Sequence, residues 1–271
     1  MNMINLKDIC IETEKAALET SRFILKESEI FDISRAEKKG HNDFVSYVDK
    51  GSEKMLVEKL SRLLPEAGFN TEEGTSAKKG ARYCWVIDPL DGTTNFIHGF
   101  HPYAISIGLM EFDDVVAGVV LEVSGNELFT AWKDGGAWLN GKRIHVSGIR
   151  KLEDSLLATG FPYSNFGLLQ QYMDCFSYLV RNAQGLRRLG SAAIDMAYVA
   201  CGRFEGFYEY DLHPWDVAAG TILVREAGGI VSDFSGDEKR ISGEELIASN
   251  KTVYPELQEI LFKFMKTQNI T

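Results

Sequence analysis

The segment at residues 85–96 constrains this chain most, because it joins a buried strand to a turn that carries two carboxylates. Residues 83–87 are apolar and partly β-branched, which predicts a buried strand. Pro89 has no backbone N–H, so we expect the strand ladder to end there. Asp88 and Asp91 would then lie at the carboxyl end of that strand.

The next residues, from Gly92 onward, are of types that can bind an anion. Gly92 lets the backbone approach a ligand closely, and Thr93 or Thr94 is expected to cap a short helix whose free N–H groups favour negative charge. Neighbouring carboxylates would repel an anion unless a cation lay between them. The segment therefore predicts a metal ion held against a phosphate, although an aspartate in such a place is also a common cap or turn former.

Acidic residues in two other segments extend this pattern. Glu72 and Glu73 precede the strand, and Asp216 follows Pro214 and Trp215 in the first turn of a predicted helix. Oxygen ligands from three separate segments suit hard cations such as Mg²⁺ or Mn²⁺.

These motifs resemble those of a known family. Residues 85–96 resemble the first signature of the inositol monophosphatase family, and residues 215–220 with 226–229 resemble its second. The similarity spans nearly the whole chain. It implies a Mg²⁺-dependent, Li⁺-sensitive phosphatase of inositol monophosphates and similar small polyol phosphates, in the form of a homodimer.

The resemblance implies two metal ions. Asp88 would bridge both, Glu72 and the Leu90 carbonyl would complete one, and Asp91 and Asp216 would complete the other.

Neighbouring charged residues leave alternatives open. Glu73 is either a solvated carboxylate or a support for a ligand. Asp49 and Lys39, or its neighbour Lys38, resemble residues of a loop associated with a third, weaker metal. They could equally be a helix N-cap and a solvated charge run.

The implied reaction uses a metal-activated water and needs no histidine or serine nucleophile. The Thr93 hydroxyl, together with Glu72, would orient and deprotonate the water, while Asp91 holds a metal. The products would be an alcohol and inorganic phosphate. The implied substrate contacts are Asp91, Gly92, Thr93, Gly190, Ser191, Ala192, Glu209 and Asp216.

Two residues on the alcohol side have more than one interpretation, and a third departs from the family pattern. Glu209 would bind sugar-like hydroxyls or pair with Arg187 or Arg188. His213 would contact substrate or be a partly buried loop residue. Asp211 adds a carboxylate where relatives often have a small residue, so the family's substrate range does not transfer directly.

Composition bounds the remaining possibilities. The 271 residues are 45% hydrophobic, enough for one large core or two smaller ones. No apolar run is long enough for a membrane helix and the first residues do not resemble an export signal, so we expect a cytoplasmic location. The net charge of −10 argues against a nucleic-acid partner. Four scattered cysteines favour reduced thiols.

The hydrophobic periodicity predicts two regions that differ in the order of their helices and strands. Helices near residues 5–28 and 50–64 precede an antiparallel meander of strands that ends near residue 139. Strands and helices alternate from residue 151 onward. We therefore expect an N-terminal α+β half at residues 1–150, which carries the metal signature, and a C-terminal α/β half at 151–271, which completes the site. The resemblance implies a layered α-β-α-β-α sandwich.

Other functions remain open. Fructose-1,6-bisphosphate or a nucleotide 3′-phosphate would suit the same superfamily. The chain could also be a non-catalytic regulatory protein on this scaffold, because a fold does not guarantee turnover. The complete carboxylate set with Thr93 favours catalysis.

Overall fold

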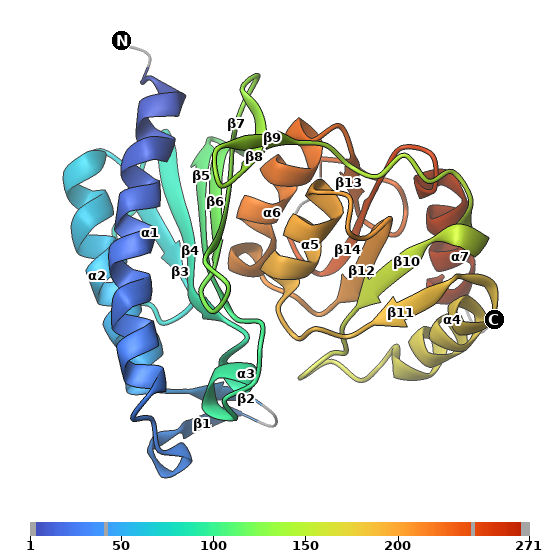
Figure 1. Cartoon of the computed structure of the whole chain (residues 1–271), viewed down its shortest axis with the longest axis horizontal. Helices are drawn as coiled ribbons and strands as arrows, with labels where there is room; N and C mark the ends of the chain where they lie inside the picture. Colours follow the sequence, from blue (N-terminus) through green and yellow to red (C-terminus); the bar gives the residue numbers. More distant parts are fainter. Residues whose placement is uncertain (1–3, 41–42, 240–241, 267–271) are drawn as a thin grey trace.

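The computed structural model describes residues 4–40, 43–239 and 242–266. Its two larger sheets lie between three helical layers, and a small two-stranded sheet lies apart from them (Figure 1). Helices α1 and α2 form one outer layer, α5 and α6 lie between the sheets, and α4 and α7 form the other outer layer. The layered α-β-α-β-α fold is therefore confirmed.

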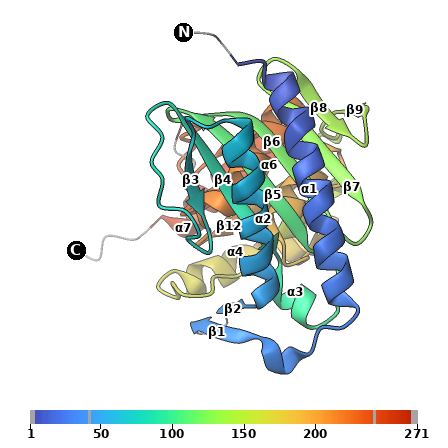
Figure 2. The ribbon, with the colours of Figure 1, turned by 90° about the vertical axis from the view of Figure 1, so that its left-hand side faces the viewer.

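Helices α1 (Leu6–Ser28) and α2 (Tyr47–Leu63) lie side by side across one face of the larger sheet (Figure 2). The Asn5 side chain accepts N–H groups at the start of α1. Helix α2 begins three residues before the predicted start at residue 50, because Ser46 caps it and Asp49 closes a capping box.

The larger sheet has seven strands in the order β3-β4-β5-β6-β7-β8-β9. Strand β3 is parallel to β4, and all other neighbours are antiparallel. The predicted meander is confirmed, and β3 and β9 extend it at its two edges. The strands are β3 (Gly68–Thr71), β4 (Tyr83–Asp91), β5 (Ala104–Glu111), β6 (Asp114–Glu122), β7 (Glu127–Trp132), β8 (Gly136–Leu139) and β9 (Lys142–Ile144).

The prediction that the ladder ends at Pro89 is wrong. Asp88 pairs with Ser106 and Asp91 pairs with Ala104, so β4 has one extra residue between these two pairs. Pro89 lies within this irregularity, where its missing N–H leaves no gap in the ladder. The bulge keeps both aspartates on one strand.

Helices α5 (Ala192–Ala200) and α6 (Pro214–Glu226) fill the middle layer. Gly108 pairs with Gly118 across β5 and β6, and a Cβ at either position would lie 2.9 Å or less from atoms of α6. The two glycines therefore allow α6 to pack directly on the sheet, which brings its first turn close to the end of β4.

The smaller sheet has the order β11-β10-β12-β14-β13, with β11, β10 and β12 parallel. Its strands are β10 (Leu156–Thr159), β11 (Gly185–Arg187), β12 (Gly206–Tyr210), β13 (Ile230–Ser232) and β14 (Glu245–Ser249). The remaining elements are β1 (Glu37–Gly40), β2 (Asp43–Val45), α3 (Thr93–Ile97), α4 (Leu169–Asn182), α7 (Tyr254–Met265) and 3-10 turns at Ile33–Arg35 and Leu152–Asp154.

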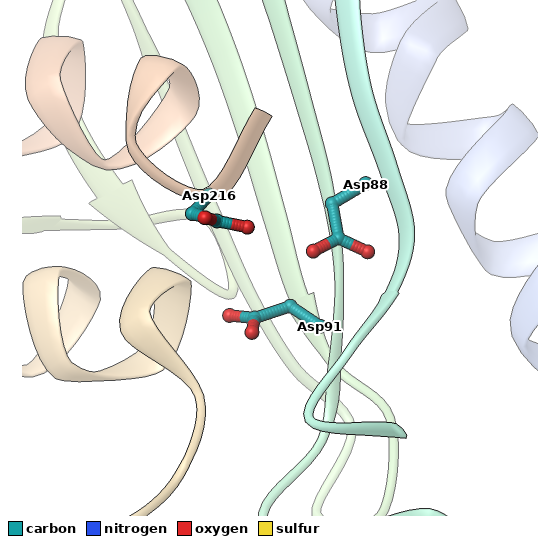
Figure 3. A group of neighbouring side chains, drawn as sticks. All are labelled: Asp88, Asp91 and Asp216. Atoms are coloured by element: carbon teal, nitrogen blue, oxygen red, sulfur yellow. The ribbon is translucent and has the colours of Figure 1, made fainter. Parts of the chain in front are cut away.

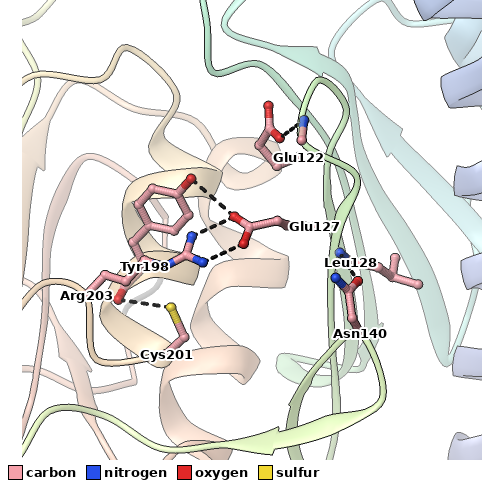
Figure 4. Close-up of polar contacts among 8 residues, drawn as sticks. Glu122, Glu127, Leu128, Asn140, Tyr198, Cys201 and Arg203 are labelled. Atoms are coloured by element: carbon pink, nitrogen blue, oxygen red, sulfur yellow. Dashed lines mark hydrogen bonds and ion pairs between the residues drawn. The ribbon is translucent and has the colours of Figure 1, made fainter.

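The two predicted halves share a core and polar contacts. Side chains of β4 to β8 pack with those of α5 and α6 in one buried cluster. At its edge Arg203 forms a two-pronged ion pair with Glu127, and the Tyr198 hydroxyl donates to the same carboxylate (Figure 4). A division at residue 150 stays a prediction.

Two expectations from the sequence concern the state of the cysteines and the length of the apolar helices. Cys10, Cys84, Cys175 and Cys201 are all free thiols. None of the helices in the described part of the chain is long and apolar enough to cross a membrane.

Candidate active site

A cleft of about 490 Å³ lies where the end of β4 meets the first turns of α5 and α6. The structure brings the predicted ligands of the two main metal ions and all predicted substrate contacts to its wall. These residues are Glu72, Asp88, Leu90, Asp91, Gly92, Thr93, Gly190, Ser191, Ala192, Glu209 and Asp216.

Three aspartates converge in the cleft. Asp88 and Asp91 project from the end of β4, and Asp216 projects from the first turn of α6 toward them (Figure 3). Each offers a carboxylate oxygen that lies within 4.8 Å of those of the other two. An all-oxygen set at this spacing fits a hard divalent cation.

The electrostatics of this cluster point the same way. Burial, together with the negative charges of Glu72 and the other two aspartates, raises the pKa of Asp88 well above its ordinary value. Burial and the charge of Asp91 likewise raise the pKa of Asp216. Ionised carboxylates at this place therefore need a compensating cation.

Glu72 reaches the cleft from the end of β3, beside β4. Its backbone N–H donates to the Ile87 carbonyl at 3.2 Å. The buried Glu53 of α2 fixes the following turn, because its carboxylate accepts the Thr71 hydroxyl at 2.9 Å and the N–H groups of Glu73 and Thr75 at 2.7 Å each. Glu53 thus holds the segment that carries Glu72.

Asp91 is held by the start of α5. Its Oδ2 accepts the Ser191 hydroxyl and the Ala193 N–H, each at 2.7 Å. Burial raises the pKa of Asp91 to about 6, although these hydrogen bonds act in the opposite direction. The Ser191 hydroxyl, a predicted substrate contact, is therefore bonded to a predicted metal ligand.

The end of β4 and the start of α3 form the signature turn (residues 88–96), whose capping differs from the prediction. Gly92, at φ 94°, is the N-cap of α3, and no side chain caps this helix, so neither Thr93 nor Thr94 does so. The Thr93 hydroxyl instead lies 2.8 Å from Asp49 Oδ1 and 3.0 Å from the Leu90 carbonyl oxygen. Its oxygen keeps lone pairs that can accept a hydrogen bond from water.

Asp49 is fully buried, and it is not one of the described residues that line the cleft. Its Oδ2 accepts the Ser46 N–H at 2.8 Å and the Ser46 hydroxyl at 2.6 Å, while Oδ1 accepts Thr93. Asp49 is not the N-cap of α2, which is Ser46, but it closes the capping box as the N3 residue. A third-metal role for Asp49 stays a prediction. The side chains of Lys38 and Lys39 lie outside the described residues.

The opposite wall of the cleft carries the predicted alcohol contacts. Glu209 is buried at the end of β12, and a Cβ at Gly160 would lie 2.1 Å from both of its carboxylate oxygens. Burial raises the pKa of Glu209, whereas the positive charge of Arg188 lowers it. The His213 ring stacks on Trp215 with centroids 4.8 Å apart, and both residues line the cleft.

Sequence reasoning missed several residues of the site. Glu53 lies four residues after Asp49 on the buried face of α2, and a carboxylate on an otherwise core-facing stripe was the available signal. Ala193 acts through its backbone, which no sequence signal marks. Tyr163, Ser164 and Phe166 line the cleft from a segment without regular secondary structure.

Comparison with known proteins decides the family. The family model described as the inositol monophosphatase family matches residues 6–266. This chain belongs to that family. A Nus factor SuhB of Pseudomonas aeruginosa is 41% identical over 248 residues, covering 90% of this chain and 92% of the relative. An inositol-1-monophosphatase of Rhizobium meliloti is 40% identical over 224 residues, covering 82% and 84%.

A solved structure agrees in fold. The crystal structure of extragenic suppressor protein suhB from Bartonella henselae superposes with a TM-score of 0.89 at 36% identity, covering 94% of this chain and 99% of that one. Inositol monophosphatases are generally metal-dependent, and this member has an acidic group that can hold a metal ion.

Proposed function

We propose that this inositol monophosphatase family member hydrolyses inositol monophosphates and similar small polyol phosphates with Mg²⁺, or Mn²⁺ in its place. The observation that carries the proposal is the convergence of Asp88, Asp91 and Asp216 within 4.8 Å, with Glu72 and Thr93 on the same cleft. Glu72, the three aspartates and the Leu90 carbonyl would hold two ions, and a third would be weaker.

The chain's own groups have separate tasks in this proposal. When bound, Mg²⁺ would lower the pKa of water and neutralise charge on the phosphoryl group. Thr93, oriented by Asp49, would accept a hydrogen bond from the attacking water, and Glu72 would take its proton. The backbone N–H groups of Gly92 and Thr93 would bind phosphate oxygens.

The alcohol part of the substrate would lie against the wall of the cleft that carries Glu209. Glu209 would accept hydrogen bonds from ring hydroxyls, and the backbone of Gly190 and Ala192 at the start of α5 would border the same space. The burial of Glu209 supports this role, because a hydrogen-bond donor supplied by the ligand would stabilise a buried carboxylate. The homodimer, the cytoplasmic location and Li⁺ sensitivity remain part of the proposal.

A panel of phosphate esters tests the proposal. Phosphate release would be measured for inositol 1-phosphate, glycerol 2-phosphate, fructose 1,6-bisphosphate and a nucleotide 3′-phosphate, with and without Mg²⁺. We expect Mg²⁺-dependent release with the highest kcat/KM for inositol 1-phosphate. A higher kcat/KM for the bisphosphate or the nucleotide would assign the corresponding alternative, and no release from any ester would refute a phosphatase.

A second candidate is a regulatory role without catalysis, which the name Nus factor on a 41% identical relative supports. The net charge of −10 argues that such a role would act through protein contacts and not through nucleic acid. Expression of Asp91→Asn in place of the wild-type chain in its host separates the roles. Normal growth with the variant would support regulation, and loss of the wild-type phenotype would support catalysis.

A further inference from the structure

The segment between β10 and α4 forms one wall of the cleft. Residues 161–167 have no helix or strand, and Tyr163, Ser164 and Phe166 face the cleft from this segment. We call residues 161–167 the alcohol wall. Because the segment lacks a ladder of its own, its position depends on bonds to other parts of the chain.

Asp211 supplies most of these bonds. Its Oδ2 accepts the N–H groups of Ser164 at 3.0 Å and Asn165 at 2.8 Å. Both carboxylate oxygens also lie within 3.1 Å of the Ser164 hydroxyl. One side chain therefore holds two consecutive peptide groups of the alcohol wall.

The backbone at Asp211 is itself held by hydrogen bonds to residues 243 and 244. Its backbone N–H donates to the Glu244 carbonyl at 3.1 Å, and that of Leu212 donates to the Gly243 carbonyl at 3.0 Å. Asp211 has φ 67°, a left-handed conformation that favours glycine. A glycine would fit this backbone with less strain, so the aspartate at this place gives up backbone preference while its side chain gains contacts.

A second tether joins the wall to Arg188, the residue after β11. Arg188 Nη2 donates to the Tyr163 hydroxyl at 2.9 Å, and Gly160, the residue before the segment, lies directly against Glu209. The alcohol wall therefore begins beside Glu209, the group proposed to bind the alcohol.

We propose that Asp211 is a positioning residue that fixes the alcohol wall and thereby makes the enzyme selective for ring-shaped polyol phosphates. This inference rests on the proposed function. Asp211 lines the same cleft, but its carboxylate is bonded to Ser164 and Asn165 and it is not one of the proposed metal ligands. We therefore expect its removal to loosen alcohol binding and to leave the chemical step unchanged.

The variant Asp211→Gly tests this, because glycine suits the left-handed backbone and only the side-chain bonds are lost. The matched control is Asp134→Gly, which removes an exposed aspartate at φ 62° that does not line the cleft. We expect KM for inositol 1-phosphate to rise about tenfold in Asp211→Gly, with kcat changed less than about twofold. The KM for glycerol 2-phosphate, a smaller alcohol, should change less than about twofold in either variant.

The variant Asp211→Asn separates hydrogen bonding from charge. The amide oxygen can accept both backbone N–H groups, so the asparagine variant should recover most of the wild-type KM. If it behaves like Asp211→Gly, the charge and not the clamp is responsible, and the proposal fails. An equal rise in KM for both esters in Asp211→Gly would overturn it as well.

Hydrogen exchange gives a readout without turnover. The Ser164 and Asn165 amides should exchange faster in Asp211→Gly than in the wild type or in Asp134→Gly, and unchanged exchange would refute the clamp. If the wild type releases no phosphate while these amides respond as expected, the proposed function fails and the clamp itself stands.

Discussion

The aspartates of the cleft and the nearby carboxylate of Glu53 contrast in the way their charge is satisfied. Asp88 and Asp216 in the cleft each accept one backbone N–H, from Leu90 at 2.9 Å and His213 at 2.7 Å, and otherwise face other acids. Glu53 on α2 accepts three donors from a single turn. Burial alone therefore does not distinguish a metal site. The cleft is distinguished by carboxylate oxygens of three acids that face one another within 4.8 Å.

The same contrast separates two tasks. The carboxylate of Glu53 stabilises the native backbone, because its acceptors match the donors of the turn. The cleft acids oppose folding when they are ionised, since burial and mutual repulsion raise their pKa values. A bound cation would offset this destabilisation. In the metal-free protein, neutralising a cleft acid should therefore raise the free energy of unfolding, whereas changing Glu53 should lower it.

The largest effect on rate is expected for Asp91→Asn. The amide oxygen can keep the bonds to Ser191 and Ala193, which would place an NH₂ group where a metal ligand is needed. Turnover should fall by on the order of 10³-fold or more. The metal-free variant should be at least as stable as the wild type in urea. A variant that kept more than about a tenth of the wild-type rate at saturating Mg²⁺ would contradict the assignment.

A smaller loss of rate is expected for Thr93→Ala, because the hydroxyl acts on the water while its backbone N–H survives. We expect kcat to fall about 100-fold with little change in the Mg²⁺ concentration needed for half-maximal rate. Initial rates over a range of Mg²⁺ concentrations measure both quantities. An unchanged kcat would mean that the bonds of Thr93 to Asp49 and Leu90 are only structural.

Glu53→Gln should act mainly on stability. The amide NH₂ cannot accept, so at least one donor of residues 71–75 would be left buried and unpaired, at a cost of about 1–3 kcal/mol in the free energy of unfolding. The required Mg²⁺ concentration should also rise, because this segment carries Glu72.

The matched control is Glu205→Gln. Glu205 is buried and accepts the Leu156 N–H at 2.7 Å, but it is not one of the described residues that line the cleft. We expect this variant to lose stability in urea without a change in the required Mg²⁺ concentration. If both variants left the Mg²⁺ requirement unchanged, Glu53 would have no special relation to the cleft.

The sequence predicted most of what local chemistry determines. The buried strand at residues 83–87 and the start of α1 after Asn5 were predicted, because apolar patterning and side-chain capping act locally. Helix α2 begins at Tyr47, three residues before the predicted start. The pairing around Pro89 was not predictable in the same way, because a bulge depends on the neighbouring strand.

The site was predictable in part for the same reason. The family resemblance indicated which residues line the cleft, but tertiary contacts decide which partners they have. Thr93 is bonded to Asp49 across 44 positions, and Ser191 is bonded to Asp91 across 100. Neither pairing has a spacing rule. Thr93, predicted as a helix cap, is bonded to Asp49 instead, and Ser191, predicted as a substrate contact, is bonded to Asp91, a proposed metal ligand.

The pH dependence of stability follows from these pKa shifts. The pKa of Asp91 is raised from 3.8 to about 6, so the folded protein binds this proton more tightly than the unfolded chain does. The resulting stability is complete below the ordinary value and is lost as pH rises through about 6. For Asp91 alone this loss is on the order of 3 kcal/mol.

Urea unfolding of chelator-treated protein at pH 5 and pH 8, with and without Mg²⁺, tests the central claim that the cleft acids form a cation site. Without Mg²⁺ we predict a free energy of unfolding that is lower at pH 8 than at pH 5. Saturating Mg²⁺ should remove most of that difference in the wild type and much less of it in Asp91→Asn. The same fall in stability with and without Mg²⁺ would contradict a cation site in this cleft.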